Sequence, residues 1–358
     1  MKIDSPPLLL DEQNTAEYLR ARGWIEADEP VEIGRLAGGV SNEVFYVARP
    51  SAPDREFVVK QARHQLRTAQ PWFSSIERIW REVAVMRACQ QALDVAAPAD
   101  LRARTPAIVA EDRTNYTFAM TAADRAHRVW KRDLLDGVID ASIGRECGRL
   151  LGVLHSATWD DEPTRRELGD RTLFDELRMD PYYRSVAAAC PEHAGHFERL
   201  IASVPENLRS LVHADFTPKN LLVWSDGLMM VDFETGHFGD PAFDLGLFMA
   251  HLVLKQVANP AAAVAHRQLK QAFLSAYETT VRPRIGDADY AQLVERGIQH
   301  LAGCTWARLD GKSRIEYLED ESRREAVRRA CRAILDDRPR QWNDALEVFE
   351  FNMDGQRR

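Results

Sequence analysis

The chain has 358 residues, of which 45% are hydrophobic and 28% are charged, as in a folded globular protein with one large or two moderate domains. Its formal net charge is −8, whereas nucleic-acid-binding proteins usually carry a basic surplus, so nucleic acid is not expected as the main partner. The acidic balance fits a cationic or neutral substrate without selecting one.

The first residues contain a run of just three leucines, which is too short for the core of a signal peptide. The longest apolar stretch, residues 245–254, contains His251 and is too short to span a bilayer. The five cysteines are widely spaced and form no Cys-x-x-Cys pair, which argues against a zinc site and against a disulfide framework. We therefore expect a cytoplasmic protein without a membrane partner.

The first third of the chain is predicted to be rich in strands. Strand-like runs cover residues 31–36, 43–48 and 57–59, and two more lie at 107–110 and 116–120. Apolar residues at three- and four-residue spacing over 76–86 predict one helix among these strands.

Helical patterns dominate after Met120, for example over residues 143–154, 264–277 and 290–351. The exception is a predicted hairpin, with strands at 221–224 and 228–231 and a turn at 225–227. We place a boundary near residues 121–124, which divides the chain into a part of residues 1–121 and a part of residues 122–358.

The strongest chemical signal surrounds this hairpin. His213, Asp215 and Asn220 precede it in the pattern His-x-Asp-x-x-x-x-Asn, and Asp232 follows it in Asp-Phe-Glu. Because the hairpin folds the chain back, Asn220 and Asp232 are expected to converge. An amide oxygen and a carboxylate are hard ligands that suit Mg²⁺, and the neighbouring Asp215 can accept a proton from a hydroxyl group.

This pattern resembles the catalytic core of the aminoglycoside phosphotransferases, which choline kinases and methylthioribose kinases share. The run Gly-Asp-Pro-Ala-Phe-Asp-Leu at 239–245 is also similar to that family. The resemblance implies an α+β, protein-kinase-like two-lobed fold with a small β-rich N-terminal nucleotide-binding lobe and a larger, mainly α-helical C-terminal lobe. The site residues that it implies are Asp215 as catalytic base, Asn220, Asp232 and Glu234 as metal ligands, and His213 and Asp244 as supports of the catalytic loop.

The same resemblance implies a set of nucleotide-binding residues. They are Gly38, Gly39, Ser41, Asn42, Lys60, Glu82, Met120 and Ala122. The Gly-Gly turn would let backbone amides approach phosphate closely, Lys60 would contact the α- and β-phosphates, and the backbone near Met120 would hold adenine. A buried lysine needs a fixed carboxylate, for which we favour Glu82 over the alternative Glu77.

The expected function is transfer of the ATP γ-phosphate to a hydroxyl of a small molecule with the help of Mg²⁺. A protein kinase is disfavoured because Ala214 replaces the arginine of His-Arg-Asp and because residues 235–239 are too few for an activation loop. A pseudokinase or regulatory protein and a metal-dependent hydrolase are the alternatives.

The acceptor remains open among amino sugars, methylthioribose, choline-like alcohols and amino alcohols, and so does a homodimer. The segment 301–313, which includes Arg308, is a candidate part of the acceptor site, although a packed helix followed by a glycine turn explains it equally well. His155 is expected to have a structural role.

Overall fold

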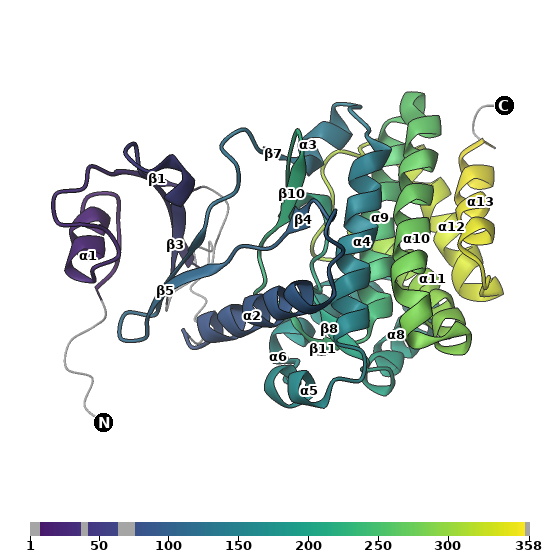
Figure 1. Cartoon of the computed structure of the whole chain (residues 1–358). Helices are drawn as coiled ribbons and strands as arrows, with labels where there is room; N and C mark the ends of the chain where they lie inside the picture. The colour runs from purple at the N-terminus through teal and green to yellow at the C-terminus, as the bar shows by residue number, and fades with distance from the viewer. Residues whose placement is uncertain (1–7, 37–41, 64–75, 355–358) are drawn as a thin grey trace. The chain divides into compact units, whose positions relative to one another are not determined.

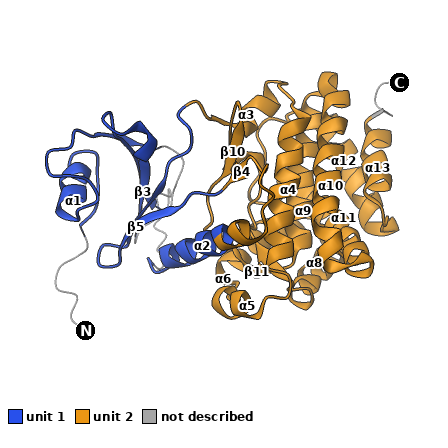
Figure 2. Cartoon of the chain, viewed as in Figure 1, with its two compact units in different colours: residues 1–90, 105–125 blue, residues 91–104, 126–358 orange. Residues whose placement is uncertain are grey.

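The computed structural model describes residues 8–36, 42–63 and 76–354. The chain forms two compact units, shown in different colours in Figure 2. The first comprises residues 1–90 and 105–125, and the second comprises residues 91–104 and 126–358.

The first unit is built on a five-stranded antiparallel sheet. Its strands are β1 (Glu32–Arg35), β2 (Asn42–Ala48), β3 (Phe57–Ala62), β5 (Ile108–Asp112) and β6 (Thr117–Thr121), and their order in the sheet is β1-β2-β3-β6-β5. Burial alternates along β2, where Phe45 and Val47 are fully buried, because successive side chains of a strand point to opposite faces.

The described residues of this part contain two α-helices, where one was expected from the sequence, and a short 3-10 helix at Pro53–Arg55. The expected helix is α2 (Arg78–Ala96), and the additional one is α1 (Thr15–Ala21). Tyr18 and Leu19 of α1 join Phe45, Val47 and other apolar residues of the sheet in one hydrophobic cluster. With just seven residues, α1 offers too little periodicity to be recognised from the sequence, and its packing on the sheet stabilises it.

The division into units differs from the boundary expected at 121–124 in two ways. The first unit continues to Arg125, and residues 91–104 group with the second unit. The second difference has a local cause, since β4 (Ala103–Arg104) pairs in parallel with a strand of the second unit and the Arg102 amide donates a 2.8 Å hydrogen bond to Glu146.

The second unit is mainly helical (Figure 1). Its helices are α3 (Trp130–Leu135), α4 (Ala141–Ala157), α5 (Glu162–Leu168), α6 (Thr172–Phe174), α7 (Ser185–Ala189), α8 (Ala194–Glu206), α9 (Pro241–Ala258), α10 (Ala263–Ile285), α11 (Asp287–Asp310), α12 (Glu321–Asp337) and α13 (Trp342–Asp354), with a π-helical segment at Asp175–Arg184. The long helices α4, α10, α11 and α9 pack side by side, with α10 against α4 and α11 against α9.

Glycines allow these helices to pack closely against one another. Gly144, Gly148 and Gly152 repeat every four residues along α4, and a Cβ atom at Gly148 would lie 2.3 Å from the Phe273 carbonyl oxygen of α10. On α9, a Cβ atom at Gly246 would lie 2.4 Å from the His300 Cβ of α11. Side chains larger than hydrogen would therefore push apart helices that carry the core.

The predicted hairpin is present in this unit. Strands β9 (Leu221–Trp224) and β10 (Gly227–Met230) pair antiparallel, and β4 and β7 (Arg128–Val129) complete a four-stranded sheet. Gly227 already pairs with Trp224, so the turn consists of Ser225 and Asp226 and the second strand begins and ends one residue earlier than predicted. A separate pair of strands, β8 (Ser210–Val212) and β11 (His237–Gly239), lies on either side of the hairpin in sequence.

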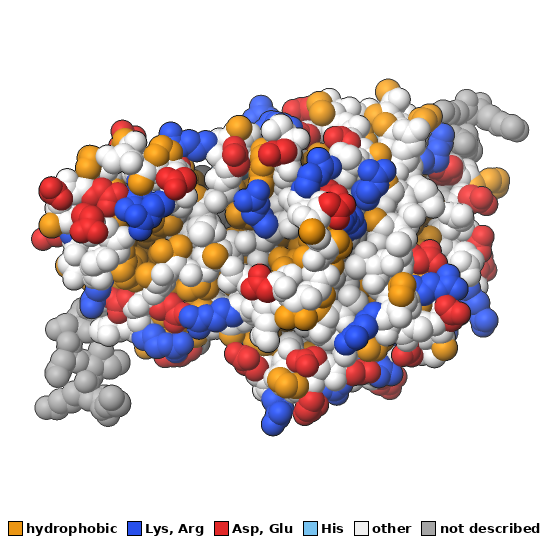
Figure 3. Space-filling model, viewed as in Figure 1, with side chains coloured by type: hydrophobic (Ala, Val, Ile, Leu, Met, Phe, Trp, Pro, Cys, Tyr) orange, Lys and Arg blue, Asp and Glu red, His pale blue; other side chains and the backbone are white. Residues whose placement is uncertain are grey.

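In the described chain no single helix has the length and apolarity needed to cross a membrane. The segments Pro241–Ala258 and Pro260–Ile285, which meet at a sharp bend, reach that length and apolarity when they are taken together. On the face shown in Figure 3, acidic and basic side chains are interspersed.

Candidate active site

The hairpin brings its two flanking residues to the same place. The Val231 amide donates a 2.9 Å hydrogen bond to the Asn220 carbonyl oxygen, which extends the pairing of β9 and β10 by one position. Asp232 follows directly, so Asn220 and Asp232 lie side by side at the open end of the hairpin, as the sequence analysis expected.

Asp215 lies beside them, with both carboxylate oxygens in contact with cations or donors. Its Oδ1 lies 2.9 Å from an Arg178 guanidinium nitrogen, and its Oδ2 lies 2.8 Å from Lys219 Nζ and 2.7 Å from Asn220 Nδ2. Burial alone would raise the pKa of Asp215, but Arg178 and Lys219 outweigh it and lower the pKa to about 2. Asp215 is therefore ionised throughout the physiological pH range.

Arg178 connects the acidic residues of the site. It comes from the π-helical segment Asp175–Arg184, and its Nε also donates a 2.7 Å hydrogen bond to the Ala214 carbonyl oxygen. Burial would lower the pKa of this guanidinium, but the negative charges of Asp215, Glu234 and Asp232 raise it. These three carboxylates are thus close enough for their charges to act on one cation.

Asp244, on α9, holds the loop that carries Asp215. Its two carboxylate oxygens accept hydrogen bonds of 2.7 Å each from the backbone amides of His213 and Ala214. Ala214 has a φ of 58°, in the left-handed region that non-glycine residues rarely adopt, and the bonds to Asp244 and Arg178 maintain this strained conformation.

The ring of His213 is fixed by backbone groups on both sides. Its Nδ1 accepts a hydrogen bond from the Asp215 amide at 3.2 Å, so its Nε2 carries the proton and donates to the Val231 carbonyl oxygen at 3.2 Å. Burial lowers the pKa of His213 even though Asp244 and Asp215 oppose the effect, which favours this neutral tautomer. His213 therefore connects the catalytic loop to the end of the hairpin.

The run at 239–245 positions Asp244. The carboxylate of Asp240 caps α9 by accepting from the Ala242 amide at 3.0 Å, and Arg296 binds its two oxygens at 3.0 and 3.2 Å. His155, which is fully buried, lies 2.8 Å from the Tyr277 hydroxyl and 3.4 Å from Asp244 Oδ2. The structural role expected of His155 agrees with this position.

A divalent cation fits the donor set at the open end of the hairpin. The Asn220 amide nitrogen is used by Asp215, and within the described chain its amide oxygen accepts no hydrogen bond and is left for a ligand. Asp232 has a φ of 72°, a second strained position at this site. Among the described residues, no group of three or more His, Cys, Asp or Glu side chains is arranged to hold a metal. An Asn–Asp pair is the kind of sparse protein set that Mg²⁺ completes with water and phosphate oxygens.

In the first unit, the structure contains the ion pair expected between Lys60 and Glu82. Lys60 Nζ on β3 lies 2.6 Å from Glu82 Oε1 on α2, and the two residues are 7% and 2% exposed. The alternative partner, Glu77, is exposed and bonds to the Tyr116 hydroxyl, raising the pKa of that phenol.

The other predicted nucleotide-binding residues are only partly described. Gly38, Gly39 and Ser41 lie outside the described residues. Asn42 begins β2 and is 6% exposed, and its buried side-chain oxygen accepts no hydrogen bond from a described residue. Met120 lies near the end of β6, and the Ala122 amide donates to the Glu56 carbonyl oxygen at 3.3 Å.

Sequence reasoning missed two cations that touch Asp215. Lys219 was visible as the fourth residue after Asp215, before Asn220, whereas Arg178 lies in a segment without any motif. The segment 301–313 consists of the end of α11 and a turn beginning at Gly311, where a Cβ atom would lie 2.7 Å from the Pro181 carbonyl oxygen.

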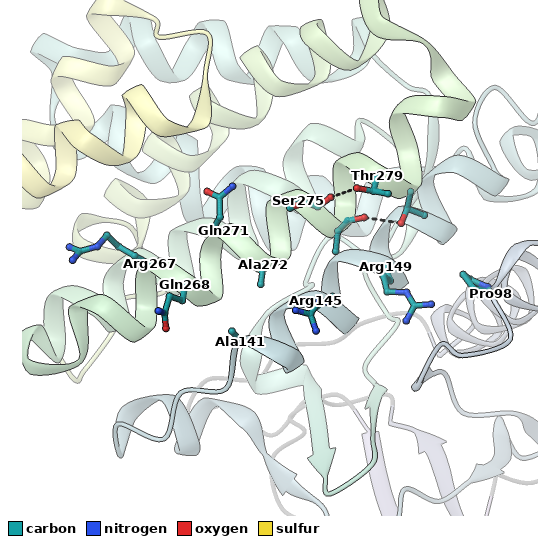
Figure 4. Close-up of a pocket in the computed structure, with 12 residues that line it drawn as sticks. Pro98, Ala141, Arg145, Arg149, Arg267, Gln268, Gln271, Ala272, Ser275 and Thr279 are labelled. Carbon is teal, nitrogen blue, oxygen red and sulfur yellow. Dashed lines mark hydrogen bonds between the residues drawn. The ribbon is translucent and has the colours of Figure 1, made fainter.

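A cavity of about 990 Å³ lies elsewhere, along α4 and α10. Figure 4 shows Arg145 and Arg149 of α4 facing Gln268 and Ser275 of α10 across this region. None of the predicted site residues lines it, so it is no part of the candidate active site.

The model of a family described as "Phosphotransferase enzyme family" matches residues 32–281, which is more than half of the chain. No curated protein matches the chain.

Among solved structures, an amicoumacin kinase in complex with AMP-PNP, Ca²⁺ and Ami has a TM-score of 0.51 at 14% identity, with 94% of this chain and 97% of that chain covered. A choline/ethanolamine kinase family protein from Mesorhizobium loti has a TM-score of 0.47 at 16% identity, covering 95% and 92%. An aminoglycoside phosphotransferase from Alicyclobacillus acidocaldarius has a TM-score of 0.47 at 14% identity, covering 99% and 100%. At these identities the amicoumacin kinase supports likeness of fold alone, and the predicted α+β class is confirmed.

Proposed function

Because the chain belongs to the phosphotransferase enzyme family, as its motifs predicted, we propose that it is an ATP-dependent kinase that phosphorylates a hydroxyl group of a small molecule. The observation that carries this proposal is the convergence of Asp215, Asn220 and Asp232 at the end of one hairpin. Each expected catalytic position is filled by a residue with suitable chemistry, which favours an active enzyme over a pseudokinase.

Asp215 orients the acceptor hydroxyl and accepts its proton as the bond to phosphorus forms. With a pKa of about 2, its carboxylate is a weak base, so its main contribution is orientation. Phosphoryl transfer passes through a loose transition state in which the nucleophile needs little prior deprotonation, and a positioned, ionised aspartate meets this requirement.

Two further groups would serve the phosphates. A divalent cation held by Asn220 and Asp232 would supply positive charge to the phosphate oxygens, with Glu234 as a further candidate ligand. Lys60, fixed by Glu82, binds the α- and β-phosphates of ATP as a point charge. Glu82 supplies the negative charge that a buried ammonium requires.

The proposal is tested by measuring nucleotide binding and ATP consumption in the same variants. Asp215→Ala is expected to abolish acceptor-dependent ATP consumption while AMP-PNP still binds in the presence of Mg²⁺. Lys60→Met is expected to weaken AMP-PNP binding at least tenfold. Full turnover by Asp215→Ala would refute the assignment of the base.

The same experiment separates the alternatives. A pseudokinase would bind AMP-PNP and consume no ATP with any acceptor. A metal-dependent hydrolase would act on its substrate without nucleotide, and its activity would not depend on Lys60.

A further inference from the structure

Lys255 is buried in the second unit without a carboxylate. It lies on α9, is 1% exposed, and makes one long hydrogen bond of 3.4 Å to the His251 carbonyl oxygen. Burial, together with the positive charges of Lys131 and Arg308, lowers the pKa of Lys255 to about 7. Within the part of the chain that the structure describes, no negative charge acts on this ammonium, although buried lysines are normally paired.

Two further donors beside Lys255 have no acceptor. The Tyr317 ring centre lies 5.3 Å from Lys255 Nζ, and its buried hydroxyl has no hydrogen-bond partner. The Nε of Arg308, on α11, is also buried without a partner among the described residues, while its Nη1 donates to the Ser313 hydroxyl and its Cζ lies 5.9 Å from the Tyr182 ring centre. Burying donors without acceptors is unfavourable, so this arrangement is costly unless a ligand supplies the acceptors.

The surroundings of this donor cluster, defined as Lys255, Arg308 and Tyr317, are positively charged. His251 lies one turn before Lys255 on α9, and burial lowers its pKa well below the usual value, with Lys255, Arg308, Lys219 and Lys131 all acting in the same direction. The electrostatic potential around the donor cluster is therefore positive, although the whole chain carries a net charge of −8. A concentration of positive charge attracts anions.

The donor cluster is next to the candidate catalytic residues. Lys219 contacts Asp215, and its charge also lowers the pKa of His251. Arg178 contacts Asp215 as well, and its charge, like that of Arg308, lowers the pKa of Cys304 on α11. Along α9, His251 lies seven residues after Asp244, or about 10 Å. The Lys255 side chain folds back toward the catalytic loop, since its Nζ bonds the carbonyl oxygen of His251.

We propose that Lys255, Arg308 and Tyr317 bind an anionic group of the acceptor, so that the substrate is a hydroxy acid or a phosphorylated polyol and not a cationic amino compound. This inference rests on the proposed function and specifies its acceptor. A carboxylate or a phosphate group would accept hydrogen bonds from all three unpaired donors and neutralise the ammonium of Lys255. Asp244, which holds the catalytic loop, and His251 are about 10 Å apart along α9, so a substrate that reaches both Asp215 and the donor cluster needs a chain of several carbons.

The test uses four six-carbon polyols that differ in one terminal group. They are gluconate, sorbitol 6-phosphate, sorbitol and glucamine, which carry a carboxylate, a phosphate, a neutral hydroxymethyl group and an ammonium group. Binding is measured by calorimetry to the full-length protein saturated with AMP-PNP and Mg²⁺, at constant ionic strength, so that phosphate-binding groups of the nucleotide site are already occupied. We expect gluconate or sorbitol 6-phosphate to bind at least tenfold more tightly than glucamine, and the better of the two identifies the anion.

Three variants locate the effect. Lys255→Met and Arg308→Gln are each expected to reduce the preference for the anion at least tenfold. Lys270→Met is the matched control, because Lys270 is also a buried lysine, at 2% exposure on α10, but bonds Gln256 and faces Glu350. It should retain the wild-type affinities, and thermal unfolding verifies that each variant is folded.

Equal binding of the four polyols, tighter binding of glucamine, or an anion preference that survives Lys255→Met would each overturn the proposal. Failure of the wild-type protein to bind AMP-PNP would instead refute the proposed function. The polyol measurements are made without nucleotide as well, so the two failures are distinguishable.

Discussion

The unpaired ammonium of Lys255 predicts a variant that is more stable and less functional than the wild-type protein. A fall in the pKa of Lys255 from 10.5 to about 7 corresponds to about 5 kcal/mol of unfavourable burial of the charge, at ~1.4 kcal/mol for each factor of ten. Methionine fills a similar volume without the charge, and replacing buried ionic groups by apolar ones typically stabilises proteins by about 1–4 kcal/mol. Lys255→Met should therefore raise the free energy of unfolding by roughly that amount below pH 7.

The pH dependence gives this prediction a definite sign. Below pH 7 the lysine is protonated in both the native and the unfolded state, so the cost of burying the charge is fully present. Between pH 7 and 10.5 the unfolded state keeps a proton that the native state has lost, and wild-type stability rises with pH relative to the variant. The advantage of Lys255→Met should thus be largest at pH 6 and should shrink steadily by pH 9.5.

The charged and titratable neighbours of Lys255 do not reverse this sign. The neighbours are His251 on the same helix, Lys131 on α3, His266 on α10, Arg308 on α11, and Tyr317 in the segment that follows α11. The two histidines have lowered pKa values because of burial, so they remain neutral over the range from pH 7 to 9.5.

The assay is urea unfolding at pH 6, 7.5 and 9.5 for the wild type, Lys255→Met and Lys270→Met. Lys270→Met should gain less, since the substitution removes the hydrogen-bond partner of Gln256 and one of the two cations near Glu350, which keeps its contact with Arg267. A Lys255→Met protein that is less stable than the wild type at pH 6, or a difference that does not change with pH, would refute the reasoning.

Three more predictions follow from the described contacts. Asp244→Asn should reduce kcat more than tenfold and lower Tm, because the new amide nitrogen would face a backbone N–H that bonds a carboxylate oxygen in the wild-type protein. Steady-state kinetics and calorimetry measure the two quantities, and wild-type values would contradict the role of Asp244 in holding the catalytic loop. Gly148→Ala should cost about 1–3 kcal/mol in urea unfolding, because its Cβ atom would lie 2.3 Å from a backbone oxygen, whereas Gly195→Ala, with a nearest atom at 3.6 Å, should be neutral or stabilising. Arg178→Gln should raise the pKa of Asp215 and move the acid limb of the kcat/KM profile to higher pH, and an unchanged profile would exclude Arg178 as a positioning residue.

The parts of the site that the sequence predicted are those set by local structure. A hairpin that closes between Asn220 and Asp232 returns the chain to its starting point, so the meeting of these residues follows from the turn and from strand pairing. The pairing of Lys60 with Glu82 was likewise predictable, because a buried lysine requires a carboxylate and a helix follows its strand.

The residues that were missed depend on tertiary packing. Arg178 reaches Asp215 from a π-helical segment and Lys255 is buried on α9, and no local pattern marks either of them. Arg308 lies in the candidate segment 301–313, but nothing in the sequence indicates that its charge acts on Lys255 of another helix. Residues 91–104 group with the second unit because the short strand β4 pairs in parallel with β10, more than a hundred residues later. Pairing over such a separation cannot be inferred from the periodicity of either segment.

The central claim is that Asp215 directs a phosphoryl group from ATP to an alcohol. Phosphorus-31 NMR of a reaction with ATP, Mg²⁺ and a mixture of sugars, amino alcohols and hydroxy acids measures this directly. The wild-type protein should produce ADP together with a new phosphomonoester resonance, and Asp215→Ala should produce neither. ADP with inorganic phosphate alone, or the same phosphomonoester formed at the wild-type rate by Asp215→Ala, would contradict the account.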